Sequence, residues 1–438
     1  MLKRILAALL LLTILFPSAC AAVVPTDTQM RGVWVSAIYN LDYPSEGTTN
    51  ADTLRKESDA ILDRCAEIGF NTVFLQVRPT ADAYYKSDIY PWSRYLTGKQ
   101  GTAPSGNFDP LSYWVEEAHK RGLELHAWIN PYRVTRTGED EWQALSAQNP
   151  AKLHPDWTIH QGENYYFDPA LPEVRQMVVD GALEIVNNYD VDGIHLDDYF
   201  YPEGDFDDAA SFERYGAGFD DLGDWRRNNV NLLIAALDEA VHKADADISF
   251  GVSPSGIWDN AKDHEGGSAT NGYSSYAQSY ADSLYWVENG LVDYICPQVY
   301  WEIGFEKADF EIVLDWWSEA VKGTDVKLYI GIADYRSAEA TDTASKWYGS
   351  AEIERQMEML DTKGGASGTI HFRYGSVDGS AALSAMLKKH FASAPLPVTP
   401  SVPEAPAQTP TENAAPKEAE PASLFDIFSL FLYSITHA

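Results

Sequence analysis

The chain of 438 residues is poor in cysteine and in basic side chains. Three cysteines are too few for a disulfide-stabilised scaffold. Neither Cys65 nor Cys296 has a neighbouring group that would make it a nucleophile, so we expect two separately buried thiols. The 32 lysines and arginines face 65 acidic residues, and the net charge of −33 argues against nucleic acid or an anionic membrane as a partner. A neutral polymer is a compatible substrate.

Long hydrophobic runs are also missing, which leaves no segment that favours a membrane span. The run at residues 5–16 is short, follows Lys3 and Arg4, and ends in small residues around Cys20. This pattern is typical of a cleaved export signal, which we place at residues 1–21. We therefore expect an extracytoplasmic protein that is secreted or associated with the cell envelope.

Two features leave membrane association open. Cys20 could be the lipid-modified first residue of a bacterial lipoprotein, although Pro17 stands where such signals usually carry Leu. Residues 393–421 are rich in Pro, Ala and Glu and are expected to form a disordered linker. The apolar tail at 422–438 could be a docking helix, a surface-seeking segment or a truncated anchor.

Strand and helix patterns alternate along residues 30–392. Eight such units predict a parallel sheet closed into a (β/α)8 TIM barrel with long loops on the catalytic face. No Gly-rich phosphate fingerprint follows the first strand, which weakens the Rossmann alternative. The expected strands are 32–38, 72–78, 123–130, a strand within 191–202, 248–254, 292–300, 326–333 and 369–374, and the helices are 51–68, 110–120, 172–189, 224–244, 276–289, 310–321 and 351–360.

The fourth strand ends in two adjacent carboxylates, Asp197 and Asp198. Side chains alternate along a strand, so His195, Asp197 and Tyr199 should share the barrel-facing side. We expect Asp197 to be a catalytic nucleophile or charge stabiliser, with His195 holding it ionised by a hydrogen bond. In a regular strand Asp198 should point to the other face, where it would support the site or cap the loop, whereas a bulge would exchange the positions of the two aspartates; we keep Asp198 among the candidate catalytic residues.

Other polar and aromatic residues follow neighbouring strand ends, where barrel enzymes place their sites. Aromatic faces stack on sugar rings, and amides, arginines and histidines bind sugar hydroxyls. An acidic cleft of this composition indicates a carbohydrate, although many of the rings could simply pack the loops. The expected substrate-binding residues are Arg78, Asp82, His126, Trp128, Asn130, His195, Tyr199, Gln298, Tyr300 and Trp301.

Glycoside hydrolysis also needs a proton donor. Glu302, after the sixth strand, is the first choice by chain order, ahead of Asp334 and Asp82. A metal-dependent polysaccharide deacetylase is an alternative, because His126, His195 and the two aspartates are possible metal ligands. No H-x-x-x-H spacing supports it, so we expect no metal or other cofactor. A non-catalytic barrel that binds cell-wall glycan is a further alternative.

Residues 30–374 resemble the bacterial glycosyl hydrolase-like family 10. The resemblance implies a (β/α)8 barrel, export, and hydrolysis of a glycan, with peptide-free peptidoglycan strands as a suggested substrate. It also implies that Asp197, two residues after His195, is the nucleophile. The match does not extend to Glu302, and the last strand, I-H-F-R-Y-G, departs from the family pattern. The matching segments are R-G-V-W-V-S from Arg31, Q-V-R-P-T-A-D-A-Y-Y-K-S from Gln76, P-W-S-R-Y-L-T-G from Pro91, E-A-H-K-R-G-L-E-L-H-A-W-I-N-P-Y-R from Glu117, V-D-G-I-H-L-D-D-Y-F-Y-P from Val191, D-W-R-R-N-N-V from Asp224 and P-Q-V-Y-W from Pro297.

Overall fold

The computed structural model describes residues 29–202 and 204–393. The expected export signal, Cys20, the linker beyond residue 393 and the C-terminal tail lie outside these residues. Within them, no helix combines the length and apolar character needed to cross a membrane.

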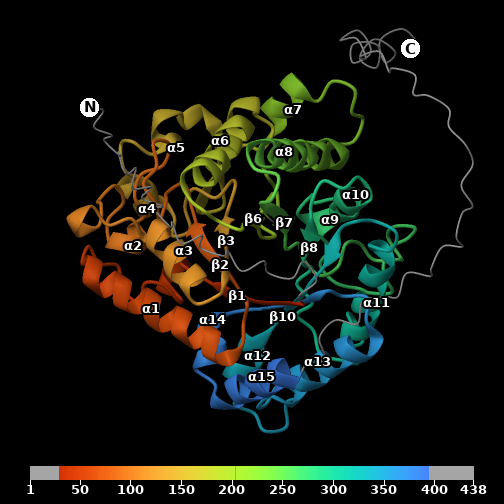
Figure 1. Ribbon diagram of the computed structural model, residues 1–438. Helices are drawn as coiled ribbons and strands as arrows, with labels where there is room; N and C mark the ends of the chain where they lie inside the picture. Colours follow the sequence, from red (N-terminus) through yellow and green to blue (C-terminus); the bar gives the residue numbers. More distant parts are fainter. Residues whose placement is uncertain (1–28, 203, 394–438) are drawn as a thin grey trace, which may run out of the picture. The chain divides into compact units, whose positions relative to one another are not determined.

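Parallel strands form a nearly closed barrel at the centre of the described residues (Figure 1). Along the sheet the order is β10-β11-β1-β2-β3-β6-β7-β8-β9. Only Tyr329 separates β9 from β10, and these two segments pair with β8 and β11 respectively, so together they occupy one strand position. The predicted (β/α)8 barrel is confirmed. The strands are β1 (Met30–Val35), β2 (Thr72–Arg78), β3 (Glu124–Ile129), β6 (Gly193–Leu196), β7 (Ser249–Val252), β8 (Tyr294–Ile295), β9 (Lys327–Leu328), β10 (Ile330–Ile332) and β11 (Gly368–His371).

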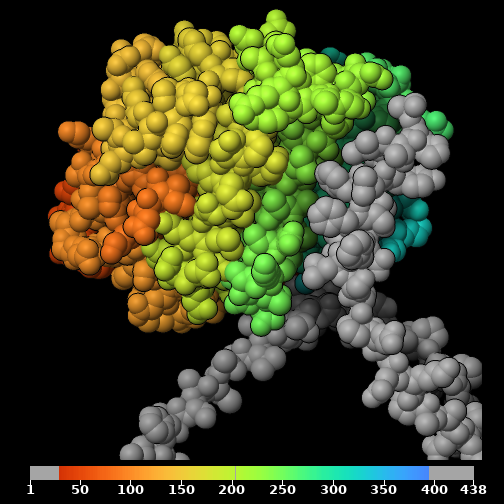
Figure 2. Space-filling model, turned by 90° about the horizontal axis from the view of Figure 1, so that it is seen from above, coloured from red at the N-terminus to blue at the C-terminus, as the bar shows by residue number. Residues whose placement is uncertain are grey.

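Helices surround the barrel, and α6 packs beside α8 on the face seen in Figure 2. The expected helix at 276–289 is instead split, because Tyr280 adopts a positive φ of 53° between α9 and α10. Side-chain caps fix several helix starts, for example Asn50 before α1 and Asp109 before α3. The helices that cover the barrel are α1 (Ala51–Ile68), α3 (Pro110–Lys120), α6 (Pro172–Asn188), α8 (Leu222–Ala244), α9 (Ser275–Gln278), α10 (Ser283–Glu288), α11 (Phe310–Ala320), α13 (Ala351–Lys363), α14 (Tyr374–Asp378) and α15 (Ala381–Ser393).

Short elements fill the loops that follow the strands. The loop after β3 carries an antiparallel hairpin of β4 (Thr158–Gln161) and β5 (Asn164–Phe167), which borders the site described below. The other short helices are η1 (Ile38–Asn40), α2 (Arg94–Thr97), η2 (Ser105–Asn107), α4 (Glu139–Ala144), α5 (Pro150–Leu153), η3 (Pro155–Trp157), α7 (Ala209–Tyr215) and α12 (Asp334–Glu339).

Two apolar clusters hold the fold together. The larger one joins strands to helices and contains Cys65. A smaller one contains Trp34, Phe74, Tyr294 and Cys296, from β1, β2, β8 and the residue after β8. Both thiols are free and buried in separate clusters, which confirms the expectation from the sequence.

Polar groups in and beside the smaller cluster form a directed hydrogen-bond chain. The Trp34 indole can only donate, and it donates to Nε2 of His195 at 3.1 Å. The proton of neutral His195 therefore lies on Nδ1, which donates to the Tyr294 hydroxyl at 3.0 Å. That hydroxyl in turn donates to Nδ1 of His126 at 3.0 Å. Burial lowers the pKa of both histidines, that of His126 to about 3, so both rings stay neutral.

Replacing Tyr294 by Phe should destabilise the barrel, because both histidines lose a buried partner. We expect the free energy of unfolding to fall by about 1–3 kcal/mol. The matched control is Tyr329→Phe, whose ring lies 5.2 Å from that of Tyr294. The control should change stability by less than about 0.5 kcal/mol in urea unfolding. Equal effects of the two substitutions would contradict the proposed chain.

Candidate active site

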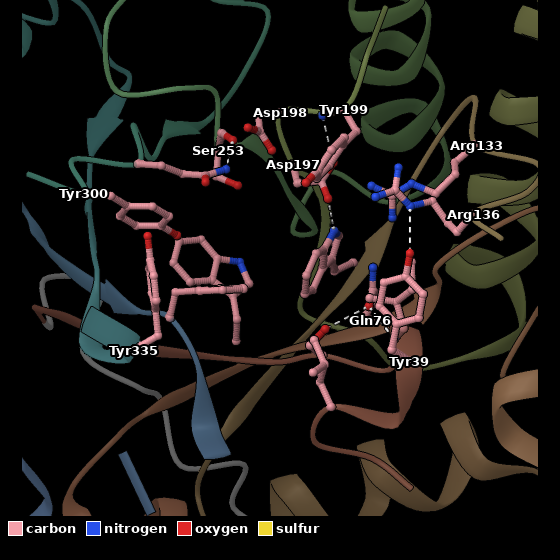
Figure 3. A pocket seen from close by; sticks show the side chains of 17 residues that line it. Tyr39, Gln76, Arg133, Arg136, Asp197, Asp198, Tyr199, Ser253, Tyr300 and Tyr335 are labelled. Atoms are coloured by element: carbon pink, nitrogen blue, oxygen red, sulfur yellow. Dashed lines mark hydrogen bonds between the residues drawn. The ribbon is translucent and has the colours of Figure 1, made fainter. Parts of the chain in front are cut away.

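A cavity of about 280 Å³ opens where β1, β2, β3, β6, β7, β8 and β11 end (Figure 3). We call it the Asp197 cavity. Asp197 and Asp198 both line it, and the rings of Trp128, Tyr199 and Tyr300 form part of its wall. It therefore combines two carboxylates with aromatic surfaces at the carboxyl end of the barrel strands, where barrel enzymes carry out their chemistry.

Hydrogen-bond donors surround the Asp197 carboxylate, which is 5% exposed. Its Oδ2 accepts from Trp128 Nε1 at 3.1 Å and from Asn130 Nδ2 at 2.6 Å. Its Oδ1 accepts from the backbone N–H of Tyr199 at 3.1 Å. Burial raises the pKa of Asp197, while Arg133 and these donors act in the opposite direction.

The side chain of Gln76 fixes the orientation of the Asn130 amide. Gln76 Oε1 accepts from the backbone N–H groups of Ala37 and Ile38, each at 3.0 Å, and these groups can only donate. Gln76 Nε2 must therefore face Asn130 Oδ1, at 2.7 Å, which leaves Asn130 Nδ2 to donate to Asp197. With the Trp128 indole as a second obligatory donor, Oδ2 of Asp197 has no place for a proton.

Asp198 lies beside Asp197 and also lines the cavity. Burial and the negative charge of Asp197 raise the pKa of Asp198 to about 7, although Gln298 hydrogen-bonds to it and opposes the shift. The expectation that Asp198 points away from the site is wrong, because β6 ends at Leu196 and alternation stops there. At pH values below 7, Asp198 therefore keeps its proton.

His195 does not hold Asp197, contrary to the expectation from the sequence. Its ring nitrogens contact Trp34, Tyr294 and Ser253. Residues i and i+2 of a strand lie about 6.6 Å apart and their side chains run parallel, so the His195 ring does not turn towards the Asp197 carboxylate. Asp197 is held mainly by donors from the neighbouring strand, β3, and the residue after it. His126 likewise lies within the barrel and contacts Tyr294.

Four of the expected binding residues line the Asp197 cavity: Trp128, Tyr199, Gln298 and Tyr300. Arg78 does not, because a register shift separates it from Gln76 on β2. Its guanidinium packs against Gly181 of α6 and stacks over Tyr90 at 4.5 Å.

Asp82, Trp301 and Glu302 also lie away from the cavity lining. Asp82 is buried and organises the loop after β2, accepting from Thr80 and Gln100 at 3.0 Å each. Trp301 packs against Gly256. The Glu302 carboxylate pairs with Lys346 at 3.0 Å, so Glu302 is poorly placed to protonate a sugar beside Asp197. Asp334, the next candidate, is fully buried against His371 at 2.9 Å.

Several residues of the cavity were not selected from the sequence. Gln76 shares the β2 face with Arg78 in an ideal strand, and only the bulge separates them. Arg133 and Arg136 lie in the loop after β3, where no periodic pattern points to them. Their proximity to two aspartates is a result of the fold.

The four possible metal ligands do not converge. His126 and His195 face Tyr294 within the barrel, whereas the two aspartates face the cavity. Across residues 29–202 and 204–393, no group of three or more His, Cys, Asp or Glu side chains is arranged to hold a metal ion.

Residues 29–349 match the family model described as glycosyl hydrolase-like 10. The chain belongs to this family. It is 40% identical to the glycosyl hydrolase YngK of Bacillus subtilis, over 84% of this chain and 72% of the relative. It is 39% identical to the glycosyl hydrolase DigH of Escherichia coli K12, over 80% of this chain and 85% of the relative. The fold is similar to the glycoside hydrolase domain of PgaB (BpsB) from Bordetella bronchiseptica, with a TM-score of 0.54 and 14% identity over 82% and 98% of the two chains.

The protein is thus a glycoside hydrolase of the glycosyl hydrolase-like 10 family, and its substrate is a glycan. This class confirms the predicted enzyme, in place of a non-catalytic glycan-binding barrel or a deacetylase. The family model ends within the loop that precedes α13, so the match covers every residue named above as lining the Asp197 cavity.

Replacing Asp198 by Asn should change how stability depends on pH. In the unfolded chain an aspartate has a pKa of about 3.9, whereas burial beside Asp197 raises the pKa of Asp198 to about 7. Between these values the folded protein keeps a proton that the unfolded chain releases, so rising pH favours unfolding. The stability of the wild type relative to Asp198→Asn should therefore fall from about pH 4 to pH 7 and then level off. Urea midpoints of both proteins test this, and a constant difference would contradict the assignment.

Proposed function

We propose that this enzyme is exported and cleaves glycosidic bonds in a cell-wall glycan, namely peptide-free strands of peptidoglycan. In this proposal Asp197 is the negatively charged group at the sugar carbon and Asp198 is the proton donor. The observation that carries the proposal is the pair of adjacent carboxylates in one aromatic cavity, with a raised pKa on Asp198 and three hydrogen-bond donors on Asp197.

The two carboxylates match the two demands of glycoside hydrolysis. Asp198 gives its proton to the leaving glycosidic oxygen, which keeps the electron pair of the broken C–O bond. Positive charge then develops on the sugar carbon and ring oxygen, and Asp197 stabilises or captures it. Water supplies the hydroxyl group to the sugar carbon, and its remaining proton returns to Asp198.

The proposed location and substrate rest on the sequence. Lys3, Arg4 and the apolar run at 5–16 form the pattern of an export signal, and an exported bacterial enzyme encounters the cell wall first. Exposed rings at the cavity, Tyr39 at 46% and Tyr199 at 50%, offer faces on which sugars can stack. Attachment to the envelope through Cys20 or the tail at 422–438 is compatible with this substrate.

Asparagine variants separate the roles of the two aspartates. On peptide-free glycan strands, Asp198→Asn should lower kcat by about 10²–10⁴-fold, because the leaving oxygen receives no proton. An aryl glycoside with an acidic leaving group needs no proton, so it should restore cleavage by Asp198→Asn but not by Asp197→Asn. Mass analysis of the released fragments and release of the aryl group provide the two measurements.

The matched control is Glu302→Gln, which removes a carboxylate that pairs with Lys346 away from the cavity. It should keep nearly full activity. Loss of activity in Glu302→Gln together with an active Asp198→Asn would transfer the donor role to Glu302. Full activity of Asp197→Asn would refute the proposed mechanism.

The orientation of Asn130 can be tested at Gln76. In Gln76→Glu, both side-chain oxygens accept, so the Asn130 amide must rotate and turn its oxygen towards Asp197. We expect kcat to fall by at least about tenfold, with the acidic limb of the pH profile moved upward and KM little changed. Gln143→Glu, which adds the same charge at an exposed position on α4, should leave the profile in place. An unshifted limb in Gln76→Glu would rule out this positioning role.

A further inference from the structure

A second cavity, of about 550 Å³, adjoins the Asp197 cavity. We call it the hairpin cavity, because the turn between β4 and β5 forms one wall and the segment after β6 forms another. Arg133, Arg136, Asp198 and Tyr199 line both cavities. The proposed proton donor therefore stands at their junction, so a sugar chain cut beside Asp198 can extend from one cavity into the other.

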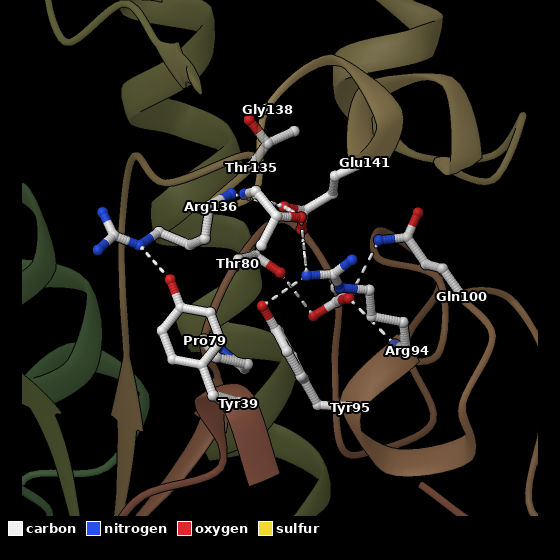
Figure 4. Close-up of polar contacts among 12 residues, drawn as sticks. Tyr39, Pro79, Thr80, Arg94, Tyr95, Gln100, Thr135, Arg136, Gly138 and Glu141 are labelled. Atoms are coloured by element: carbon white, nitrogen blue, oxygen red, sulfur yellow. Dashed lines mark hydrogen bonds and ion pairs between the residues drawn. The ribbon is translucent and has the colours of Figure 1, made fainter. Parts of the chain in front are cut away.

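The loop after β3 holds Arg136 firmly at this junction (Figure 4). The buried carboxylate of Glu141 accepts from the backbone N–H groups of Arg136 and Thr137 at 2.6 and 2.7 Å, and also contacts Arg94 at 3.1 Å. Arg136 Nε donates to the Tyr39 hydroxyl at 3.2 Å. Glu141 is thus occupied by other donors, and the guanidinium of Arg136 keeps donors for a ligand.

Arg133 donates to the Pro79 carbonyl and Arg136 to the Tyr39 hydroxyl, and neither arginine forms a direct ion pair with a described residue. Arg133 is 4% exposed, its guanidinium stacks 4.1 Å from the centre of the Tyr199 ring, and its buried Nε has no hydrogen-bond partner among the described residues. Three carboxylates face the two cavities: Asp197 is held by its own donors, Asp198 has a pKa raised to about 7, and Glu163 is exposed at the hairpin turn. The two guanidinium groups therefore stand at the junction without a direct carboxylate partner, in a chain with a net charge of −33.

We propose that the hairpin cavity is a subsite for a sugar that carries a carboxylate, and that Arg136 binds this carboxylate, with Arg133 behind it. The proposal rests on the proposed function and adds the charge of the substrate to it. A guanidinium binds a carboxylate through two parallel hydrogen bonds, which gives both affinity and orientation. Binding of this carboxylate would determine which of the two alternating glycosidic bonds of the glycan lies beside Asp198.

The test compares two forms of one substrate. Peptide-free peptidoglycan strands carry a carboxylate on every second sugar, and chemical reduction converts these groups to neutral alcohols. Wild-type enzyme should have a kcat/KM about 10–100-fold higher on the acidic strands, as expected for one charge-assisted contact. In Arg136→Gln this preference should fall to within about threefold, because the side chain keeps its polarity and loses its charge.

Arg214→Gln on α7 is the matched control, since it removes the same charge from an exposed position outside both cavities. It should keep the preference for acidic strands. Equal wild-type cleavage of both forms, or an equal loss on both forms in Arg136→Gln, would overturn the proposal. If wild type cleaves neither form, the proposed function fails, and calorimetry then decides on the subsite: binding of acidic strands that disappears in Arg136→Gln supports it, and absence of such binding refutes it.

Discussion

Hydrogen-bond direction around Asp197 is the constraint on which the site depends. Backbone N–H groups at the end of β1 cannot reverse their polarity, so they fix Gln76, which fixes Asn130, which in turn donates to Asp197. The Trp128 indole adds a second irreversible donor. These contacts favour the ionised form of Asp197 and oppose the effect of its burial. Simple proximity of two acids would leave open which of them is ionised.

The barrel interior supports this arrangement from below. Trp34, His195, Tyr294 and His126 form a buried chain whose imidazoles are neutral, so it places no net charge beneath the carboxylates. Amides of Gln76 and Asn130 lie next along the strands, and the charged groups lie at the mouth. Polarity therefore rises from the barrel interior towards its opening, and the ionised group sits where water and substrate have access.

Much of the fold was predictable from the sequence, because strand and helix periods are local properties. Strand β2 and helices α1 and α3 occur at their predicted bounds. The alternation of side chains, continued one residue past β6, correctly placed Asp197 at the barrel mouth. The errors arise where periodicity ends. A bulge after Gln76 turned Arg78 outward, β8 has only two residues and does not reach Glu302, and β6 stops before Asp198. Arg133 and Arg136 come from a loop whose path depends on tertiary contacts such as those of Glu141.

The hydrogen-bond chain to Asp197 runs across neighbouring strands, from the end of β1 through β2 and β3 to the end of β6. A slip of one residue between any two of them would replace a polar side chain in the chain by an apolar neighbour such as Leu75 or Ile129. This series of hydrogen bonds therefore forms only when all four strands are in the correct register. Only a correctly assembled barrel can hold an ionised Asp197 at its mouth, so a misaligned barrel would be left without its active centre.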